Sequence, residues 1–151
     1  MKTVWKVLGS IGLLIVIVFA GSIGKMVGKS TVQNYSEGKK EGAFEEVLTK
    51  TASQINGRLP VMVDKETRLD STVGGPGKKF TYLCTLVNFS AQEISWQHFS
   101  STLSPNIRNS VCSSKEMEVF VKNGVQVVYN YRGKNGVIVG DIVVNPSDCN
   151  F

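Results

Sequence analysis

The longest apolar stretch of the chain lies near its amino terminus. Val7 to Gly24 contains no charged residue over 18 positions and lies between Lys6 and Lys25. As a helix it would be about 27 Å long, close to the thickness of the hydrocarbon core of a bilayer. The pattern predicts a single membrane-spanning helix. A signal peptide cleaved after Ala20 is the alternative, but apolar residues continue to Val27, which favours an uncleaved anchor.

The next apolar residues recur at helical spacing. Residues 30–43 are polar and contain two glycines, which is typical of a linker. From residue 44 onward apolar residues share one helical face until the stop signal Asn56-Gly57, so a helix is predicted over Glu41 to Ile55. The apolar positions of this face are Phe44, Val47, Leu48, Ala52 and Ile55.

β-Branched and aromatic residues dominate the following segment, which indicates strands. Strands are predicted at Val61–Val63, Thr67–Val73 and Phe80–Val87. The glycine-rich turn Gly74–Gly77 joins the last two into a hairpin. In the predicted strand Phe80–Val87, side chains alternate between the two faces, and Cys84 lies on the face that carries the aromatic residues. Cys84 is therefore expected in the core.

A second helix is signalled by Ser90-Ala91-Gln92-Glu93, which has the residues of a capping box. Its apolar stripe continues to Val111. Ser104-Pro105 lies inside this stripe and predicts a break, with Pro at the first position of a new turn. A short segment, Lys115–Val121, then leads to the last part of the chain.

The last hairpin is the clearest local pattern of the sequence. It consists of Val125–Tyr131, a turn at Gly133–Gly136 and Val137–Val144, and Pro146 ends it. The chain beyond the membrane helix thus reads helix, hairpin, helix, hairpin. This order predicts an α+β domain with an antiparallel sheet covered by helices on one face.

Composition and charge indicate where the protein is located in the cell more clearly than they indicate its function. The chain has 151 residues, enough for one domain, with 17 Lys and Arg against 12 Asp and Glu. Residues 1–30 carry four lysines and no acid, so only one excess positive charge remains for residues 31–151. The excess flanks the apolar stretch, which indicates contact with lipid headgroups and excludes a nucleic-acid partner. The positive amino-terminal tail favours an amino terminus in the cytoplasm.

These observations predict three parts and a topology. Residues 1–29 form a membrane anchor, residues 30–43 a linker, and residues 44–151 an extracytoplasmic α+β domain. In the anchor, Ala20, Gly24 and Gly28 recur every four residues, a stripe of small residues on which two helices could associate into a homodimer.

Several short motifs give the chain a resemblance to a known group of proteins. They are Leu59-Pro60-Val61-Met62-Val63-Asp64, Thr67-Arg68-Leu69-Asp70, Phe80-Thr81-Tyr82, Thr85-Leu86-Val87-Asn88, Val111-Cys112 and Cys149. With them, roughly residues 20–151 resemble a family of small bacterial single-pass envelope proteins of unassigned function. The resemblance implies a single-pass protein of the bacterial inner membrane with a periplasmic domain. It implies no activity and no catalytic residues.

Residues for catalysis or cofactor binding are sparse. His98 is the single histidine, and neither a nucleophile elbow nor a zinc-ligand spacing accompanies it. Asp64, Glu66 and Asp70 are interleaved with basic residues and lack the spacing of a cation loop, so a solvated strand edge is expected. We therefore expect no catalytic residue, no cofactor and no metal.

The three cysteines differ in their surroundings. Cys112 lies at the end of the second helix and Cys149 lies beyond the last strand, where the backbone can adjust to disulfide geometry. A Cys112–Cys149 disulfide is therefore predicted, with Cys84 as a buried thiol. Three reduced cysteines in a domain that faces the cytoplasm are the alternative.

The function that these features favour is binding of another, unidentified protein by a membrane-tethered envelope module. An immunity or inhibitor protein that masks a toxin or envelope enzyme is an alternative within this class. An envelope hydrolase would require two carboxylates among Glu45, Glu46, Asp64 and Asp70 to converge in one cleft. A small-ligand or lipid carrier would need a cavity between the sheet and the helices. Tyr82, Tyr129 and Tyr131 could build an aromatic ligand surface, although tyrosine also fits ordinary half-buried strands.

Overall fold

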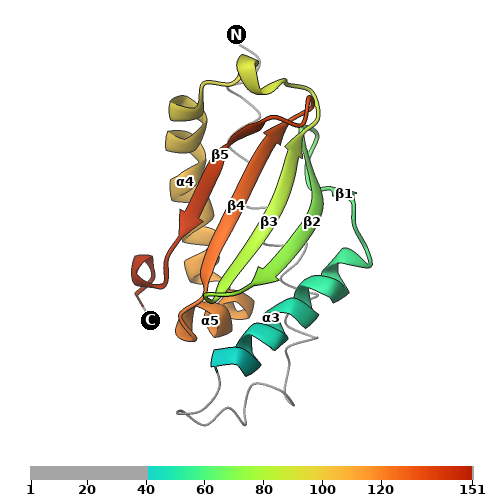
Figure 1. The fold of residues 1–151 in the computed structure, drawn as a ribbon. Coiled ribbons are helices and arrows are strands. Elements are labelled where there is room, and N and C mark those ends of the chain that lie inside the picture. Colours follow the sequence, from blue (N-terminus) through green and yellow to red (C-terminus); the bar gives the residue numbers. More distant parts are fainter. Residues whose placement is uncertain (1–40, 151) are drawn as a thin grey trace.

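Helices and strands alternate along residues 41–150, the part of the chain that the computed structural model describes. The elements are α3 (Glu41–Asn56), β1 (Val61–Met62), β2 (Thr67–Gly75), β3 (Lys79–Leu86), the 3-10 turn η1 (Ala91–Glu93), α4 (Trp96–Ser113), α5 (Lys115–Lys122), β4 (Gln126–Gly133), β5 (Ile138–Val144) and the 3-10 turn η2 (Pro146–Asp148). They form an α+β domain with a five-stranded sheet, which confirms the expected fold class (Figure 1).

The sheet follows the order of the chain, β1-β2-β3-β4-β5, and both predicted hairpins are antiparallel. The expectation of a wholly antiparallel sheet is wrong at its centre, where β3 and β4 pair in parallel. The reason is that α4 and α5 carry the chain back along the sheet after β3. The strand β4 therefore starts at the same end as β3, as a helical crossover requires.

All three helices of the described residues lie on one face of the sheet, as the sequence predicts. The register puts Gly74 of β2, the aromatic residues of β3 and β4, and Gly140 of β5 on this face. A Cβ atom on Gly74 would come within 2.3 Å of the Leu48 backbone in α3, and one on Gly140 within 2.5 Å of the Trp96 ring in α4. These two glycines therefore allow the helices to approach the sheet closely.

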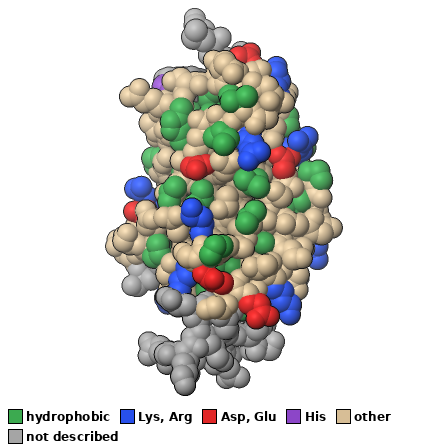
Figure 2. Space-filling model, in the orientation of Figure 1, with side chains coloured by type: hydrophobic (Ala, Val, Ile, Leu, Met, Phe, Trp, Pro, Cys, Tyr) green, Lys and Arg blue, Asp and Glu red, His purple; other side chains and the backbone are tan. Residues whose placement is uncertain are grey.

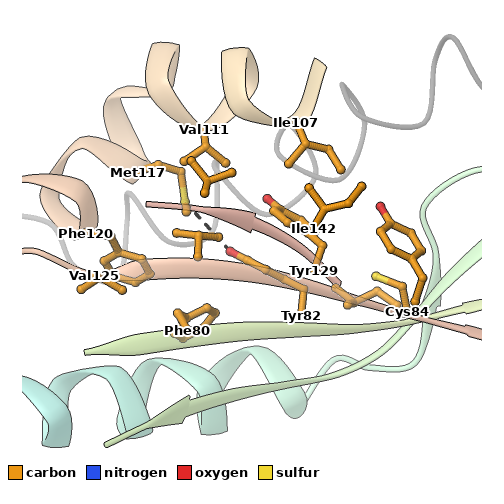
Figure 3. Packing of buried hydrophobic residues seen from close by; sticks show 14 of the residues in the cluster. Phe80, Tyr82, Cys84, Ile107, Val111, Met117, Phe120, Val125, Tyr129 and Ile142 are labelled. Atoms are coloured by element: carbon orange, nitrogen blue, oxygen red, sulfur yellow. Dashed lines mark hydrogen bonds between the residues drawn. The ribbon is translucent and has the colours of Figure 1, made fainter. Parts of the chain in front are cut away.

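The core lies between the strands and the helices α3, α4 and α5. Ile107 and Val111 of α4 point toward the aromatic residues of β3 and β4 (Figure 3). The ring of Tyr82 stacks on that of Tyr129, with centroids 4.9 Å apart, and the Tyr82 hydroxyl donates to the Met117 sulfur at 4.0 Å. The tyrosines considered for an aromatic ligand surface belong to this packed core and are 2% exposed or less; they are Tyr82, Tyr129 and Tyr131.

The helix α4 differs from the prediction at its start and at Pro105. The capping box at Ser90 and Glu93 is present, but it closes the short turn η1, and the helix begins only at Trp96. No break occurs at Pro105, which lies inside the continuous helix. An interior proline removes one helical hydrogen bond and costs about 3 kcal/mol. Leu103 and Ile107 are both fully buried on either side of it, so packing against the sheet holds the helix together.

Candidate interaction surface

The two outer edges of the sheet differ in how far their backbone groups are hydrogen-bonded to other elements. On the β2 side, the Asn56 side chain of α3 donates to the Thr72 carbonyl at 2.8 Å and accepts from the Thr72 amide at 2.7 Å. The Thr49 hydroxyl donates to the Gly74 carbonyl at 3.2 Å. Side chains of α3 thus take the place of a neighbouring strand along this part of β2, while β1 pairs with its beginning. This edge is closed to further strands.

The β5 side of the sheet has no such cover. β5 is the last strand in the sheet order, and within residues 41–150 no hydrogen bond joins the backbone of Ile138–Val144 to an element other than β4. The strand contains no proline and no lysine, which commonly protect exposed edges. Its apolar side chains are also exposed, to 58% at Ile138 and 37% at Val143.

The face of the sheet that carries no helix ends at β5 in three exposed side chains. Ile138 pairs with Arg132, Asp141 with Asn130 and Val143 with Val128 on β4. Asn130 donates to the Asp141 carboxylate at 2.5 Å and accepts from the Arg132 guanidinium at 3.2 Å. Figure 2, in the orientation of Figure 1, shows apolar side chains spread among acidic and basic ones over the face toward the viewer.

The outer side of α4 is almost free of charge. Arg108 is the only Lys, Arg, Asp or Glu among the 18 residues of α4, and Asp141 is the only one in β5. Depletion of charged residues at the centre of the patch is one compositional mark of protein interfaces. We call the exposed side chains on the two sides of the β5 edge the α4–β5 surface; they are Gln97, His98, Ser101, Thr102, Pro105, Asn106, Arg108, Asn109 and Ser113 of α4, Val137, and Ile138, Asp141 and Val143 of β5.

Two links hold the α4–β5 surface together. Trp96, at the start of α4, covers Gly140 in the middle of β5. At the other end of the helix, Cys112 is joined in a disulfide to Cys149, with Cα atoms 5.1 Å apart. This is the pair that the sequence analysis favours, and Cys84 is the free, buried thiol. The two ends of α4 are thus linked to the middle of β5 and to the segment that follows this strand, and Figure 1 shows α4 along the β5 side of the sheet.

The carboxylates that a hydrolase would need do not converge. The Glu45 side chain accepts from the Gly77 amide at 2.6 Å, next to the turn after β2. Asp64 accepts from the Glu66 and Thr67 amides before β2 begins, at the other end of that strand. Asp70 accepts from Thr85 and Arg68 on the face without helices. Within residues 41–150 no group of three His, Cys, Asp or Glu side chains could hold a metal ion.

The thiol of Cys84 does not form a reactive site. It is 1% exposed, and burial, followed by the nearby carboxylates of Asp70 and Asp64, raises the pKa of Cys84 far above its ordinary value. A thiol with such a pKa stays protonated at neutral pH and is a poor nucleophile. Burial also raises the pKa of Tyr131 on the neighbouring strand. These groups are parts of the core.

The predicted membrane segment cannot be compared with the structure. Val7–Gly24 and the stripe of Ala20, Gly24 and Gly28 lie outside the described residues. Of the helices within residues 41–150, none is long and apolar enough to cross a membrane.

Comparison with protein families places the chain in a group. The family described as "Domain of unknown function (DUF8479)" matches residues 43–139, more than half of the chain and most of the described domain. The chain belongs to this family. The DUF8479 family has no assigned function, which agrees with the resemblance noted in the sequence. No curated protein matches its sequence significantly.

Solved structures share the fold of this DUF8479 protein at low sequence identity. A predicted secreted protein from Pseudomonas aeruginosa has a TM-score of 0.60 and 16% identity, over 75% of this chain and 100% of that one. EpsS, the pilotin of the Vibrio vulnificus type II secretion system, has a TM-score of 0.58 and 14% identity, over 74% and 96%. AspS, the type II secretion pilotin of Vibrio cholerae, has a TM-score of 0.52 and 14% identity, over 70% and 91%. These likenesses show a common fold.

Sequence reasoning missed the α4–β5 surface, although parts of its signal were present. The run of Ser, Thr and Asn between the apolar positions of residues 96–113 is visible in the sequence. What the sequence did not give was the position of the last strand at an edge of the sheet. Because the sequence does not reveal that β3 pairs with β4, it does not reveal which strand of each hairpin lies at the edge of the sheet.

Proposed function

We propose that the chain is a non-enzymatic, membrane-tethered protein of the bacterial inner membrane whose domain binds another protein through the α4–β5 surface. In this proposal residues 1–29 are the anchor, residues 30–43 the linker, and residues 44–151 the periplasmic domain. The observation that carries the proposal is the surface itself, which is poor in charge and ends in an unpaired apolar strand edge.

Two further observations support a binding role in the envelope. Two of the proteins with this fold are pilotins, components of type II secretion systems, so the fold serves bacterial secretion machinery elsewhere. The Cys112–Cys149 disulfide suits a compartment outside the reducing cytoplasm. The carboxylates of Asp64, Asp70 and Glu45 accept hydrogen bonds in turns and from Arg68, and this use supports the binding role over a hydrolase.

Site-specific photo-crosslinking in native membranes tests the proposal. A benzophenone amino acid is placed at Ile138, on the α4–β5 surface, or at Val73, on the β2 side of the sheet. The two positions are similarly exposed, at 58% and 50%, so they differ mainly in location. We expect a discrete adduct with another envelope protein at Ile138 and none at Val73. Equal labelling at both positions, or none at either, would contradict the proposed surface.

The tethering has a separate test. Mass spectrometry of the protein from the membrane fraction should show a chain that still contains residues 7–27. A mature protein that starts at Gly21 would show that the segment is a cleaved signal peptide. For the proposed association of anchors, Gly24→Leu should weaken a membrane two-hybrid signal, because a large side chain separates the helices.

A further inference from the structure

The open edge of β5 is a template for one more strand. The outward amide and carbonyl groups of Ile138–Val144 have no partner from another element within residues 41–150, whereas Asn56 and Thr49 occupy the edge of β2. Within residues 41–150, one side of the sheet is therefore closed and the other side is left able to pair. Strand addition at such an edge draws affinity from main-chain hydrogen bonds and specificity from alternate side chains.

The side chains beside this edge define what an added strand would carry. On the face without helices, Ile138 and Val143 are exposed and apolar, and Asp141 lies between them. Cross-strand neighbours on one face are favourable when both are apolar or when their charges are opposite. A matching strand would place apolar side chains beside Ile138 and Val143 and a Lys or Arg beside Asp141.

A second copy of this chain fits the edge less well. The midpoint of Ile138–Val144 is Asp141, so two copies of β5 paired about a twofold axis over their full length would place the two Asp141 carboxylates opposite each other. Like charges directly opposite each other destabilise a pair of strands. The charge of the edge thus favours a different chain with a basic residue at the centre.

We propose that β5 binds an extended segment of the partner protein by strand addition, with a Lys or Arg of that segment beside Asp141 and apolar residues on either side. This inference rests on the proposed function and specifies its binding mode. The partner segment would become the sixth strand of the sheet, next to β5.

The test uses the full-length chain in detergent micelles and two synthetic peptides. Both peptides have nine residues that alternate Val and Thr, and they differ only at the centre, which is Lys in one and Glu in the other. We expect the Lys peptide to bind about five-fold more tightly than the Glu peptide, from the difference between an attractive and a repulsive cross-strand pair. Binding should slow hydrogen exchange of the outward amides of β5 and leave β2 unchanged.

Variants at position 141 separate the charge from the fold. Asp141→Lys should reverse the preference so that the Glu peptide binds more tightly, and Asp141→Asn, which retains a side chain of the same shape, should bind both peptides equally. Thermal melts of both variants show whether the domain is intact. An unchanged preference in folded Asp141→Lys would overturn the role of the charge, and so would absence of peptide binding to the natural chain.

The outcomes distinguish this inference from the proposed function. A crosslink at Ile138 to another protein, without protection of β5 amides by the Lys peptide, would leave the α4–β5 surface in place and refute strand addition. A crosslink at Ile138 between two copies of this chain would overturn both. Protection of β5 with a charge-dependent preference, together with a partner crosslink that maps to an extended segment with a basic residue, is the expected result.

Discussion

Replacing Gly74 by alanine should destabilise the domain far more than the same change at its neighbour Gly75. A Cβ atom at Gly74 would lie 2.3 Å from the carbonyl carbon and oxygen of Leu48 and 2.7 Å from the Thr49 nitrogen. All three are backbone atoms of α3, so no side-chain rotation relieves the contact. At Gly75, the next residue of the same strand, a Cβ atom would meet nothing within 4 Å.

The magnitude follows from how far α3 must move. An ordinary contact begins near 3.4 Å, so the helix has to shift by about 1 Å, which is felt throughout a close-packed core. Overpacking of this kind costs about 1–3 kcal/mol, and more where backbone must move. The shift also strains the hydrogen bonds from Thr49 and Asn56 to β2. Against this, Gly→Ala reduces the entropy of the unfolded chain by about 0.4–1 kcal/mol.

The expected result is that Gly74→Ala lowers the free energy of unfolding by about 2–3 kcal/mol, whereas Gly75→Ala changes it by less than about 1 kcal/mol. Urea unfolding of the full-length protein, followed by tryptophan fluorescence, measures both. The m value should stay constant, because the surface exposed on unfolding is unchanged. If Gly74→Ala were as stable as Gly75→Ala, the close approach of α3 to β2 would be refuted.

Four further predictions concern the disulfide, the thiol of Cys84, the buried residue Thr67 and the proline of α4. Reducing the Cys112–Cys149 disulfide should lower the free energy of unfolding by about 4 kcal/mol, the chain-entropy value for its loop; equal urea midpoints with and without reductant would refute this. Cys84 should resist iodoacetamide until the domain unfolds. Folding raises the pKa of the Cys84 thiol, so the unfolded chain loses the thiol proton at a lower pH than the folded chain does. The free energy of unfolding should therefore fall as the pH rises above about 9, and urea midpoints measured across that range would show this fall. Thr67→Val should be neutral or stabilising by about 1 kcal/mol, because the buried hydroxyl oxygen has no hydrogen-bond partner, and a clear loss in thermal melts would contradict this. Pro105→Ala should stabilise the domain by restoring a helical hydrogen bond, which a lowered melting temperature would contradict.

Local elements could be predicted from the sequence because their determinants are local. The spacing of apolar residues around Leu48 gave a helix to within one residue of its end, and the turns at Gly74–Gly77 and Gly133–Gly136 gave both hairpins. The residues of the capping box at Ser90 were also recognised, although they close a short turn. Each of these features depends on residues within about one turn or one strand of each other.

What could not be predicted depends on partners far apart in the chain. Nothing in the periodicity of β3 or β4 says that these two strands pair, so the direction of their pairing was missed. Local propensity marked Pro105 as a break, but burial of Leu103 and Ile107 against distant strands outweighs that preference. Asn56 was recognised as part of a stop signal, and its second role at the edge of β2 appears only when α3 is placed there.

The disulfide also limits how far the chain can be stretched. Tension applied between the two ends of the chain acts along its backbone. Once unfolded, the 37 peptide units between Cys112 and Cys149 could otherwise extend by about 130 Å under such load. With the bond closed, this segment contributes no more length than the gap between the two Cα atoms, 5.1 Å. Because β4 and β5 both lie inside the closed segment, tension applied between the two ends of the chain can lengthen only the parts outside Cys112–Cys149.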